Sequence, residues 1–398
     1  MSRERGAACP PDGLEAIRQL LALAALAPSS HNCQPWHVSL LDAHGHPHAD
    51  PAAAPHALVI GIDRRRALNA LPAMRGEMHL SAGGFAAILL NLLRLSGWQA
   101  GASLLPGGQQ DMLDGALEPL ARIELGAFDA RRRSPSLAAL TAALHRRRTE
   151  RGLYHAPGDG GFDLPDATRH DVLPHSLAGA PASQQWHWHA VQPGLRYSQL
   201  GAFYRQHAMR DFVHGAAWRE TYRHLVFGGA GQPRDGTGIH IQSLFGPMPA
   251  WRRCLHRVLL HPRLLGALGP FGASASVGAQ IERLIHSSPA VVYLSTAASH
   301  AQAPCRHVLA GEAIARLWLA ASASGLSLHP LSVALQHPDL RARLGHLLGC
   351  DEELLFIARA GVPLHPGNPA LRYRRDPSAF CSPPLAAGCA AAHHRTQE

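Results

Sequence analysis

The sequence predicts an α+β fold built from two copies of one structural unit. In each copy, a strand of buried type precedes an apolar helix bracketed by glycines, and a later strand ends on glycine. Gly83 and Gly97 lie 14 residues apart around the first helix, and Gly311 and Gly325 lie equally far apart around the second. We therefore expect a first unit over residues 12–135, a second unit with inserts over 136–376, and a disordered tail over 377–398.

The first unit is expected to open with an amphipathic helix. Asp12 suits the N-cap position, Pro28 marks the end, and one helical face carries Leu14, Ile17, Leu21 and Ala24. The stretches "WHVSLLD" and "ALVIGID" predict two strands. "GGFAAILLNLLRLSGW" is apolar nearly all round and predicts a buried central helix, and "LARIELG" predicts the closing strand.

The second unit repeats this order with longer inserts. We expect a helix at about 137–148, a strand at "WHWHAVQ" and a helical stretch at about 197–227. An apolar segment dotted with arginines continues to about residue 285. "AVVYLST", "GEAIARLWLAASASG" and "LLFIARAG" then predict a strand, a buried helix and a strand.

Composition indicates a globular protein. The 398 residues are 46% hydrophobic with a mean hydropathy of −0.07, and no uninterrupted apolar run approaches the roughly 18–20 residues of a membrane span. Residues 1–13 lack the apolar region of a signal peptide, so we expect a cytoplasmic location and no membrane partner. The seven cysteines are scattered and never form C-x-x-C, which argues against a disulfide framework or a zinc ribbon.

The basic residues exclude several classes of site. All 37 are arginines, so the chain has no P-loop lysine and no lysine for a Schiff base with a pyridoxal cofactor. The net charge of +9 is compatible with nucleic acid or a phosphorylated ligand, but no nucleic-acid-binding motif is present and we expect no such partner. The histidine-rich stretch "HGHPHAD" can bind a metal, yet it reads better as a loop in a chain of 28 histidines, and we expect no metal site.

Two kinds of polar segment stand out from this framework. "APSSHNCQPW" places short hydroxyl and amide side chains between a helix and a strand, where they can bind a polar ring edge or form a capped turn on which Gln34 and Trp36 pack. "LHRRRTERGLY" and "LRYRRDP" gather arginines that can clamp a phosphate. Their structural alternatives are cations at a helix C-terminus and a solvated basic tail.

Taken together and in this order, these motifs resemble the nitroreductase superfamily, and most of all its single-chain, tandem, Acg-type branch. The segments over 63–93 and 234–238, "GLSLHPLSVAL" and the R-x-R-R stretch add to the resemblance. Members normally form dimers with each FMN between two subunits. Because this chain carries one copy of each signature in different halves, the resemblance implies an internal pseudo-dimer with one FMN per chain, either as a monomer or in a homodimer.

The resemblance also implies roles for individual residues. The first arginine motif would meet the phosphate and the ribityl chain or flavin edge: Arg147, Arg148, Thr149 and Arg151. Arg374, with Arg372 or Arg375, would close on the phosphate. The opening loop would line the flavin from the other half: Ser29, Ser30, Asn32 and Gln34. The backbone near Leu331 and Ser332 would face the reactive part of the ring. Arg151 stands where many relatives have lysine, and His329–Pro330 replaces their Pro–hydrophobic–Glu/Gly turn.

The implied activity is flavin-centred and needs no catalytic nucleophile from the protein. We expect an FMN-dependent oxidoreductase that transfers hydride from NAD(P)H to an electron-poor organic acceptor. One alternative is a flavin-sequestering or storage protein whose segment 228–285 covers the cofactor, and another is an oxidase or dehydrogenase of a biosynthetic pathway. The chain has neither G-x-G-x-x-G nor G-x-S-x-G, which argues against a separate dinucleotide domain and a hydrolase elbow.

Overall fold

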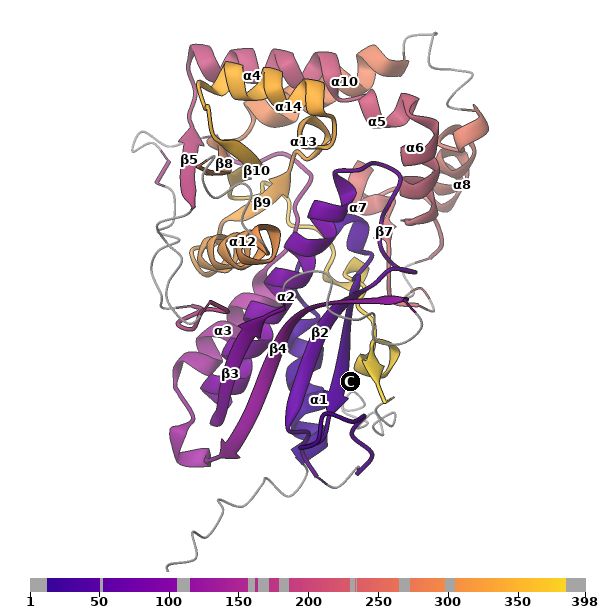
Figure 1. Cartoon of the computed structure of the whole chain (residues 1–398). Helices are drawn as coiled ribbons and strands as arrows, with labels where there is room; N and C mark the ends of the chain where they lie inside the picture. The colour runs from indigo at the N-terminus through magenta and orange to yellow at the C-terminus, as the bar shows by residue number, and fades with distance from the viewer. Residues whose placement is uncertain are drawn as a thin grey trace, which may run out of the picture.

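Two sheets and two long central helices form the framework of the protein (Figure 1). The computed structural model describes residues 13–50, 53–105, 115–156, 162–163, 172–178, 186–229, 233, 235–264, 273–297 and 305–383. The expected N-cap Asp12, Arg234 and the end of the chain from residue 384 lie outside these residues.

The first sheet has the strand order β11-β1-β2-β4-β3. Its strands are β1 (Trp36–Leu41), β2 (Ala57–Asp63), β3 (Trp98–Leu104), β4 (Leu117–Phe128) and β11 (Cys381–Ser382). β1, β2, β4 and β3 pair antiparallel, whereas β11 joins β1 in parallel. All positions of β1 and β2 are buried, including the polar His37 and Ser39 of β1.

The second sheet has the order β5-β8-β10-β9, again with antiparallel neighbours throughout. Its strands are β5 (His187–Val191), β8 (Ala290–Thr296), β9 (Ser327–Pro330) and β10 (Glu353–Gly361). This order matches β1-β2-β4-β3 strand for strand along the chain. The sequence missed β3 and β9, which follow the two central helices directly.

The central helices α2 (Met74–Ser96) and α12 (Arg306–Ala323) pack against each other, and each also contacts its own sheet. α2 begins nine residues before the predicted stretch and ends at Gly97, which has φ 113°. Among the described helices, α2 alone has the length and hydropathy of a membrane span, but 83% of its apolar window is buried inside the protein. Its apolar surface is therefore accounted for by the core.

The remaining helices surround this framework. α1 (Gly13–Ala24) packs on α2, and α3 (Ser136–Arg146) packs on both central helices. α4 (Leu195–His207), α10 (Ala273–His286), α13 (Val333–Gln336) and α14 (Pro338–Leu348) lie with the second sheet (Figure 1). The stretch predicted as helical over 197–227 is broken: α4 is followed by α5 (Arg210–Val213), α6 (Gly215–Arg223) and β6 (Leu225–Val226). The insert continues with β7 (Ile239–His240), α7 (Gln242–Phe245) and α8 (Ala250–Leu259).

The prediction of a disordered tail from residue 377 is wrong for residues 377–383. Pro377–Ala379 form a 3-10 helix, and Cys381 then pairs with Val38 at the edge of the first sheet. Phe380 is fully buried against Phe85, with ring centroids 6.0 Å apart. Burial of this aromatic ring offsets the entropy lost on ordering the segment.

Candidate functional site

The opening loop follows α1 and has an unusual backbone. His31, Asn32 and Gln34 have φ values of 50°, 53° and 50°, a left-handed conformation that side chains other than glycine adopt at a cost. Cys305 is the other described non-glycine residue with positive φ. Strain concentrated in one short loop suggests that its shape has a functional purpose.

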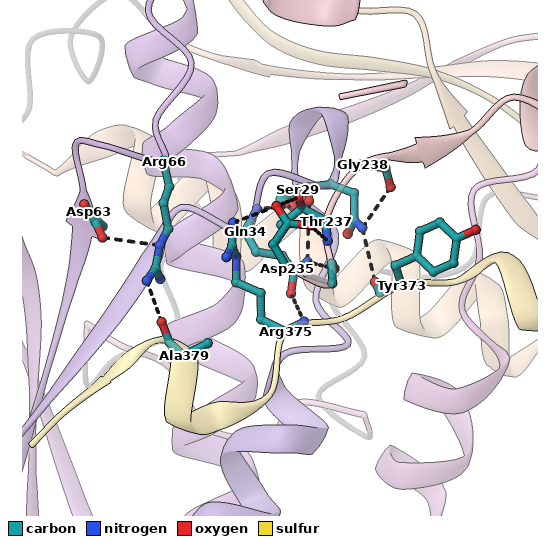
Figure 2. A network of polar contacts seen from close by, with 12 residues as sticks. Ser29, Gln34, Asp63, Arg66, Asp235, Thr237, Gly238, Tyr373, Arg375 and Ala379 are labelled. Carbon is teal, nitrogen blue, oxygen red and sulfur yellow. Dashed lines mark hydrogen bonds and ion pairs between the residues drawn. The ribbon is translucent and has the colours of Figure 1, made fainter. Parts of the chain in front are cut away.

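Gln34 fixes the loop to two distant segments (Figure 2). Its side chain is fully buried, and its Nε2 donates to the Gly236 carbonyl at 2.8 Å. Its Oε1 accepts from the Arg375 backbone N–H at 3.0 Å, and its own N–H donates to Ser29 Oγ at 3.1 Å. Protein groups therefore bind both ends of the Gln34 amide.

Asn32 makes a similar three-way connection. Its Nδ2 donates to the carbonyls of Gly238 and Tyr373, each at 3.1 Å, and its Oδ1 accepts from Arg374 Nη1 at 2.9 Å. The segment of the insert at Gly238, the opening loop and the C-terminal arginine stretch thus meet at the Asn32 amide. Asn32 lies 206 residues before Gly238 and 341 residues before Tyr373 in the sequence.

The two arginine motifs converge just after the C-terminus of α1. Arg147 Nε and Arg372 Nη2 each donate to the Leu26 carbonyl at 3.2 Å, and Arg374 Nη2 donates to it at 3.4 Å. Cations are favourable at such a helix terminus, so part of this arrangement is structural. It nevertheless brings three guanidinium groups from residues 147–374 to one point beside the opening loop.

Burial and the neighbouring guanidinium groups lower the pKa values of arginines in this cluster. Burial first, and then Arg372, Arg374 and Arg151, hold the pKa of Arg147 well below its usual value. Burial and Arg372 lower the pKa of Arg374 to about 9. Within the described part of the chain, no carboxylate forms an ion pair with Arg147 or Arg372, and Arg147 Nη1 and Arg372 Nε are buried with no hydrogen-bond partner. Such donors fit a dianionic phosphate.

Arg148 and Thr149 lie between this cluster and the second sheet. Arg148 Nη1 donates to the Gly367 carbonyl at 3.0 Å, and its own carbonyl accepts from Trp318 Nε1 at 3.3 Å. Thr149 forms a parallel bridge with Leu328 of β9. The R-R-T-x-R motif is thereby fixed next to the strand that leads to Leu331 and Ser332.

Arg151 has electrostatic neighbours in the arginine cluster, in the opening loop and in β9. Burial, then His224 and then Arg151 lower the pKa of His31. Burial, then Arg359 and then Arg151 lower the pKa of His329. Arg359, which is fully buried, donates from Nε to His329 Nδ1 at 3.0 Å. This bond leaves the proton of a neutral His329 on Nε2. His31, with its pKa lowered to about 3, is likewise neutral near pH 7.

The turn expected at the flavin ring is fixed by hydrogen bonds to neighbouring elements. The Leu331 carbonyl accepts from Tyr204 Oη at 2.8 Å, and its N–H donates to Ile357 of β10 at 2.9 Å. Ser332 precedes α13, and its Oγ accepts from Gln336 Nε2 at 3.3 Å. Both residues thus sit on a framework that would hold their backbone in place.

Glu77 is a site residue that the sequence did not single out. It lies in the first turn of α2, and its carboxyl accepts from Ser30 Oγ at 2.5 Å and from Gln336 Nε2 at 2.6 Å. An acid at a helix start is common, so the sequence offered no signal beyond its place within the segment 63–93. No three His, Cys, Asp or Glu side chains gather as metal ligands among the described residues.

Comparison with known proteins gives one close relative. The chain is 30% identical over 371 residues to a probable NAD(P)H nitroreductase, PigM, of Serratia sp., covering 90% of this chain and 91% of the relative. No family profile matches the chain.

Solved structures of low similarity were also found. An FMN-dependent nitroreductase, NfnB, of Mycobacterium smegmatis in complex with NADPH is 18% identical, covering 57% of this chain and 88% of that one, with a TM-score of 0.32. A structure assigned to the nitroreductases from Anabaena variabilis is 13% identical, covering 91% and 93%, with a TM-score of 0.38. Scores below 0.5 establish no correspondence between individual residues.

Proposed function

The chain belongs to the NAD(P)H nitroreductase family, and from this premise we propose that it is an FMN-dependent oxidoreductase that transfers hydride from NAD(P)H to an electron-poor organic acceptor. The observation that carries the proposal is the meeting of both arginine motifs with the opening loop at Leu26 and Asn32. Neither a nucleic acid nor a membrane is part of this proposal.

We further propose that the chain is an internal pseudo-dimer with one complete cofactor site, its halves dividing near residue 135. The matching strand orders of the two sheets and the packing of α2 on α12 support this. The opening loop comes from the first half, whereas the arginine motifs and the Leu331–Ser332 turn come from the second. A monomer would then contain one complete cofactor site.

In this proposal the phosphate lies at the Leu26 end. Arg147, Arg148, Arg372 and Arg374 would hold it, with Thr149 beside them. Arg151, Ser29, Ser30 and Asn32 would lie along the ribityl chain and ring, with the backbone of Leu331 and Ser332 at the ring. Gln34 would act indirectly, by fixing the loop through Gly236 and Arg375.

FMN, when bound, supplies the hydride chemistry in two half-reactions. The protein's own residues bind and orient the cofactor and place positive charge beside it. Neutral His31 and His329 add hydrogen-bonding groups without further charge. The comparisons give no support to a storage role, although the insert does reach the opening loop through Gly236 and Gly238.

The proposal is tested by reconstitution. Purified protein supplied with FMN should bind one flavin per chain, and NADPH or NADH should bleach the flavin absorbance within seconds in a stopped-flow instrument. Mass in solution, measured on the same sample, shows whether the monomer holds the flavin. Absence of FMN binding would refute the function, and two flavins per chain would refute the pseudo-dimer. Bound flavin that neither nucleotide reduces would favour storage.

A further inference from the structure

A chain of polar side chains joins the two parts of the candidate site. Ser30 Oγ donates to one carboxyl oxygen of Glu77, and Gln336 Nε2 donates to the other. The same Gln336 amide also reaches Ser332 Oγ at 3.3 Å. Glu77 is therefore the one link, within the described residues, through which side chains connect the opening loop to the Leu331–Ser332 turn.

Among the described residues, the Glu77 link occurs in the first half of the repeat, and the matching position of the second half has no carboxyl. Glu77 lies six residues before Gly83, and Cys305 lies six residues before Gly311 at the matching point of α12. Cys305 has only its Sγ directed to the Leu105 carbonyl, at 3.5 Å. The carboxyl thus occurs where the opening loop and the turn meet, and not at the matching position.

A helix-start acid in solvent would interact mainly with the helix terminus. Glu77 instead has partners 47 and 259 residues away in the sequence. Burial raises its pKa, while the bonds from Ser30 and Gln336 act in the opposite direction. The charged groups that face it from the insert and from α14 are Asp211 and Arg341. Both bonds are partly buried, and loss of such a link costs more than loss of a fully exposed contact.

We propose that Glu77 is a positioning residue of the flavin site, whose carboxyl holds the Ser30–Asn32 loop against the Leu331–Ser332 turn. The inference rests on the proposed FMN function. Because Glu77 acts on the loop and the turn and not on the arginine cluster, its effect concerns the ring end of the ligand and does not depend on the phosphate.

The first test compares Glu77→Ala with Glu77→Gln. The alanine variant should bind both FMN and riboflavin about tenfold more weakly, the equivalent of one lost hydrogen-bonded link. Gln336 Oε1 is buried with no hydrogen-bond partner, so a rotated Gln336 amide can accept from a glutamine at position 77. The glutamine variant should therefore bind both ligands nearly as wild type does. Glu118→Ala is the matched control, since Glu118 pairs with Arg75 and His79 of α2 and not with the opening loop.

The second test is a double-mutant cycle with Ser30→Ala and Gln336→Ala. If Glu77 couples Ser30 to Gln336, the effects of the two substitutions on riboflavin affinity should be non-additive when residue 77 is glutamate. They should be additive when residue 77 is alanine. The flavin absorption maximum should shift in Glu77→Ala and not in Glu118→Ala. Additive effects in the wild-type background, or unchanged affinity in Glu77→Ala, would overturn the inference. If Glu77→Ala does not fold, the wild-type cycle and Glu77→Gln decide. Failure of the wild-type protein to bind FMN would refute the proposed function instead.

Discussion

Gly83 of α2 and Gly311 of α12 occupy equivalent positions where the two central helices cross. A Cβ atom on Gly83 would clash with the Val308 carbonyl, and one on Gly311 would clash with the Leu80 carbonyl. Gly311 lies 228 residues beyond Gly83, and Val308 lies 228 residues beyond Leu80. This reciprocity, in which each partner uses the same pair of positions, is the pattern of a two-fold interface between subunits.

Gly83→Ala and Gly311→Ala should therefore destabilise the protein to a similar extent. The added methyl group would force the backbones apart, at about 1–3 kcal/mol for an overpacked core, partly offset by the better helix propensity of alanine. Urea unfolding followed by circular dichroism measures the change. Gly101→Ala in β3 is the control, because nothing lies within 4 Å of a Cβ built there. A large loss at only one of the two helix positions would contradict the two-fold relationship.

Much of this framework could be predicted from the sequence because its signals are local. The apolar runs of β1, β2 and β8 and the glycine-bracketed helices have a period and length that identify them. The short strand β9 and the edge strand β11 lack such a signal, since their pairing depends on partners elsewhere in the chain. Broken helices in the insert were also missed, because tertiary contacts and not propensity decide where α4, α5 and α6 end.

Trp36 was predicted to pack at the start of a strand, and this is confirmed. Its ring is fully buried and stacks on Phe85 with centroids 4.8 Å apart. Trp36→Ala should lower the free energy of unfolding by about 3–5 kcal/mol. Thermal unfolding of the apoprotein is the measurement. Trp251→Ala, on an exposed position of α8, should change it little, and an equal loss in both variants would contradict the assignment.

Asn32→Ala should weaken FMN binding without unfolding the chain. The substitution removes the bonds that join Arg374, Gly238 and Tyr373 to the opening loop, and each is worth about 1 kcal/mol. We expect roughly a five- to tenfold loss of affinity or somewhat more, measured by fluorescence titration. Asn368→Ala, which removes a cap on a surface 3-10 helix, serves as the control. Unchanged affinity would mean that the loop does not shape the flavin site.

The candidate site was predictable only in part, for physical reasons. The arginine and serine–asparagine motifs are short continuous stretches of sequence, so candidate binding residues could be selected from them. Whether an amide faces a ligand or the protein depends on three-dimensional partners, which is why the bonds of Gln34 to Gly236 and Arg375 could not be predicted from the sequence. Glu77 was missed because its partners come from segments that the sequence does not connect.

Stability should fall in mild acid, in part through His37. Burial, then Arg66, lowers its pKa from 6.5 to about 4. Between these values the unfolded chain binds a proton that the folded chain does not, so the contribution is complete above pH 6.5 and is lost as pH falls toward 4. Full titration of one group gives a slope of about 1.4 kcal/mol per pH unit. Urea unfolding of His37→Gln from pH 4 to 8 should show a shallower slope than wild type, and an identical slope would refute this role.

Arg374 and Arg151 should respond differently to the two flavins, because we propose that Arg374 binds the phosphate and that Arg151 meets the flavin edge. Arg374 belongs to the cluster at Leu26, where the phosphate is proposed, whereas the electrostatic neighbours of Arg151 include His31 and His329. A charge-assisted bond to phosphate is worth about 1.5–3 kcal/mol, so Arg374→Ala should weaken FMN binding by roughly ten- to a hundredfold.

Riboflavin lacks the phosphate, so its affinity should fall far less in Arg374→Ala, through the lost bond to Asn32 of the opening loop. Arg151→Ala should weaken both ligands alike, because within the described residues it makes no hydrogen bond or ion pair to the protein and remains available to the flavin edge. Titration of apoprotein with each flavin measures both effects, and Arg131→Ala, whose side chain is 92% exposed, is the control. If Arg374→Ala reduced FMN and riboflavin binding equally, the phosphate would lie elsewhere, and the proposed direction of the flavin along the site would have to be reversed or abandoned.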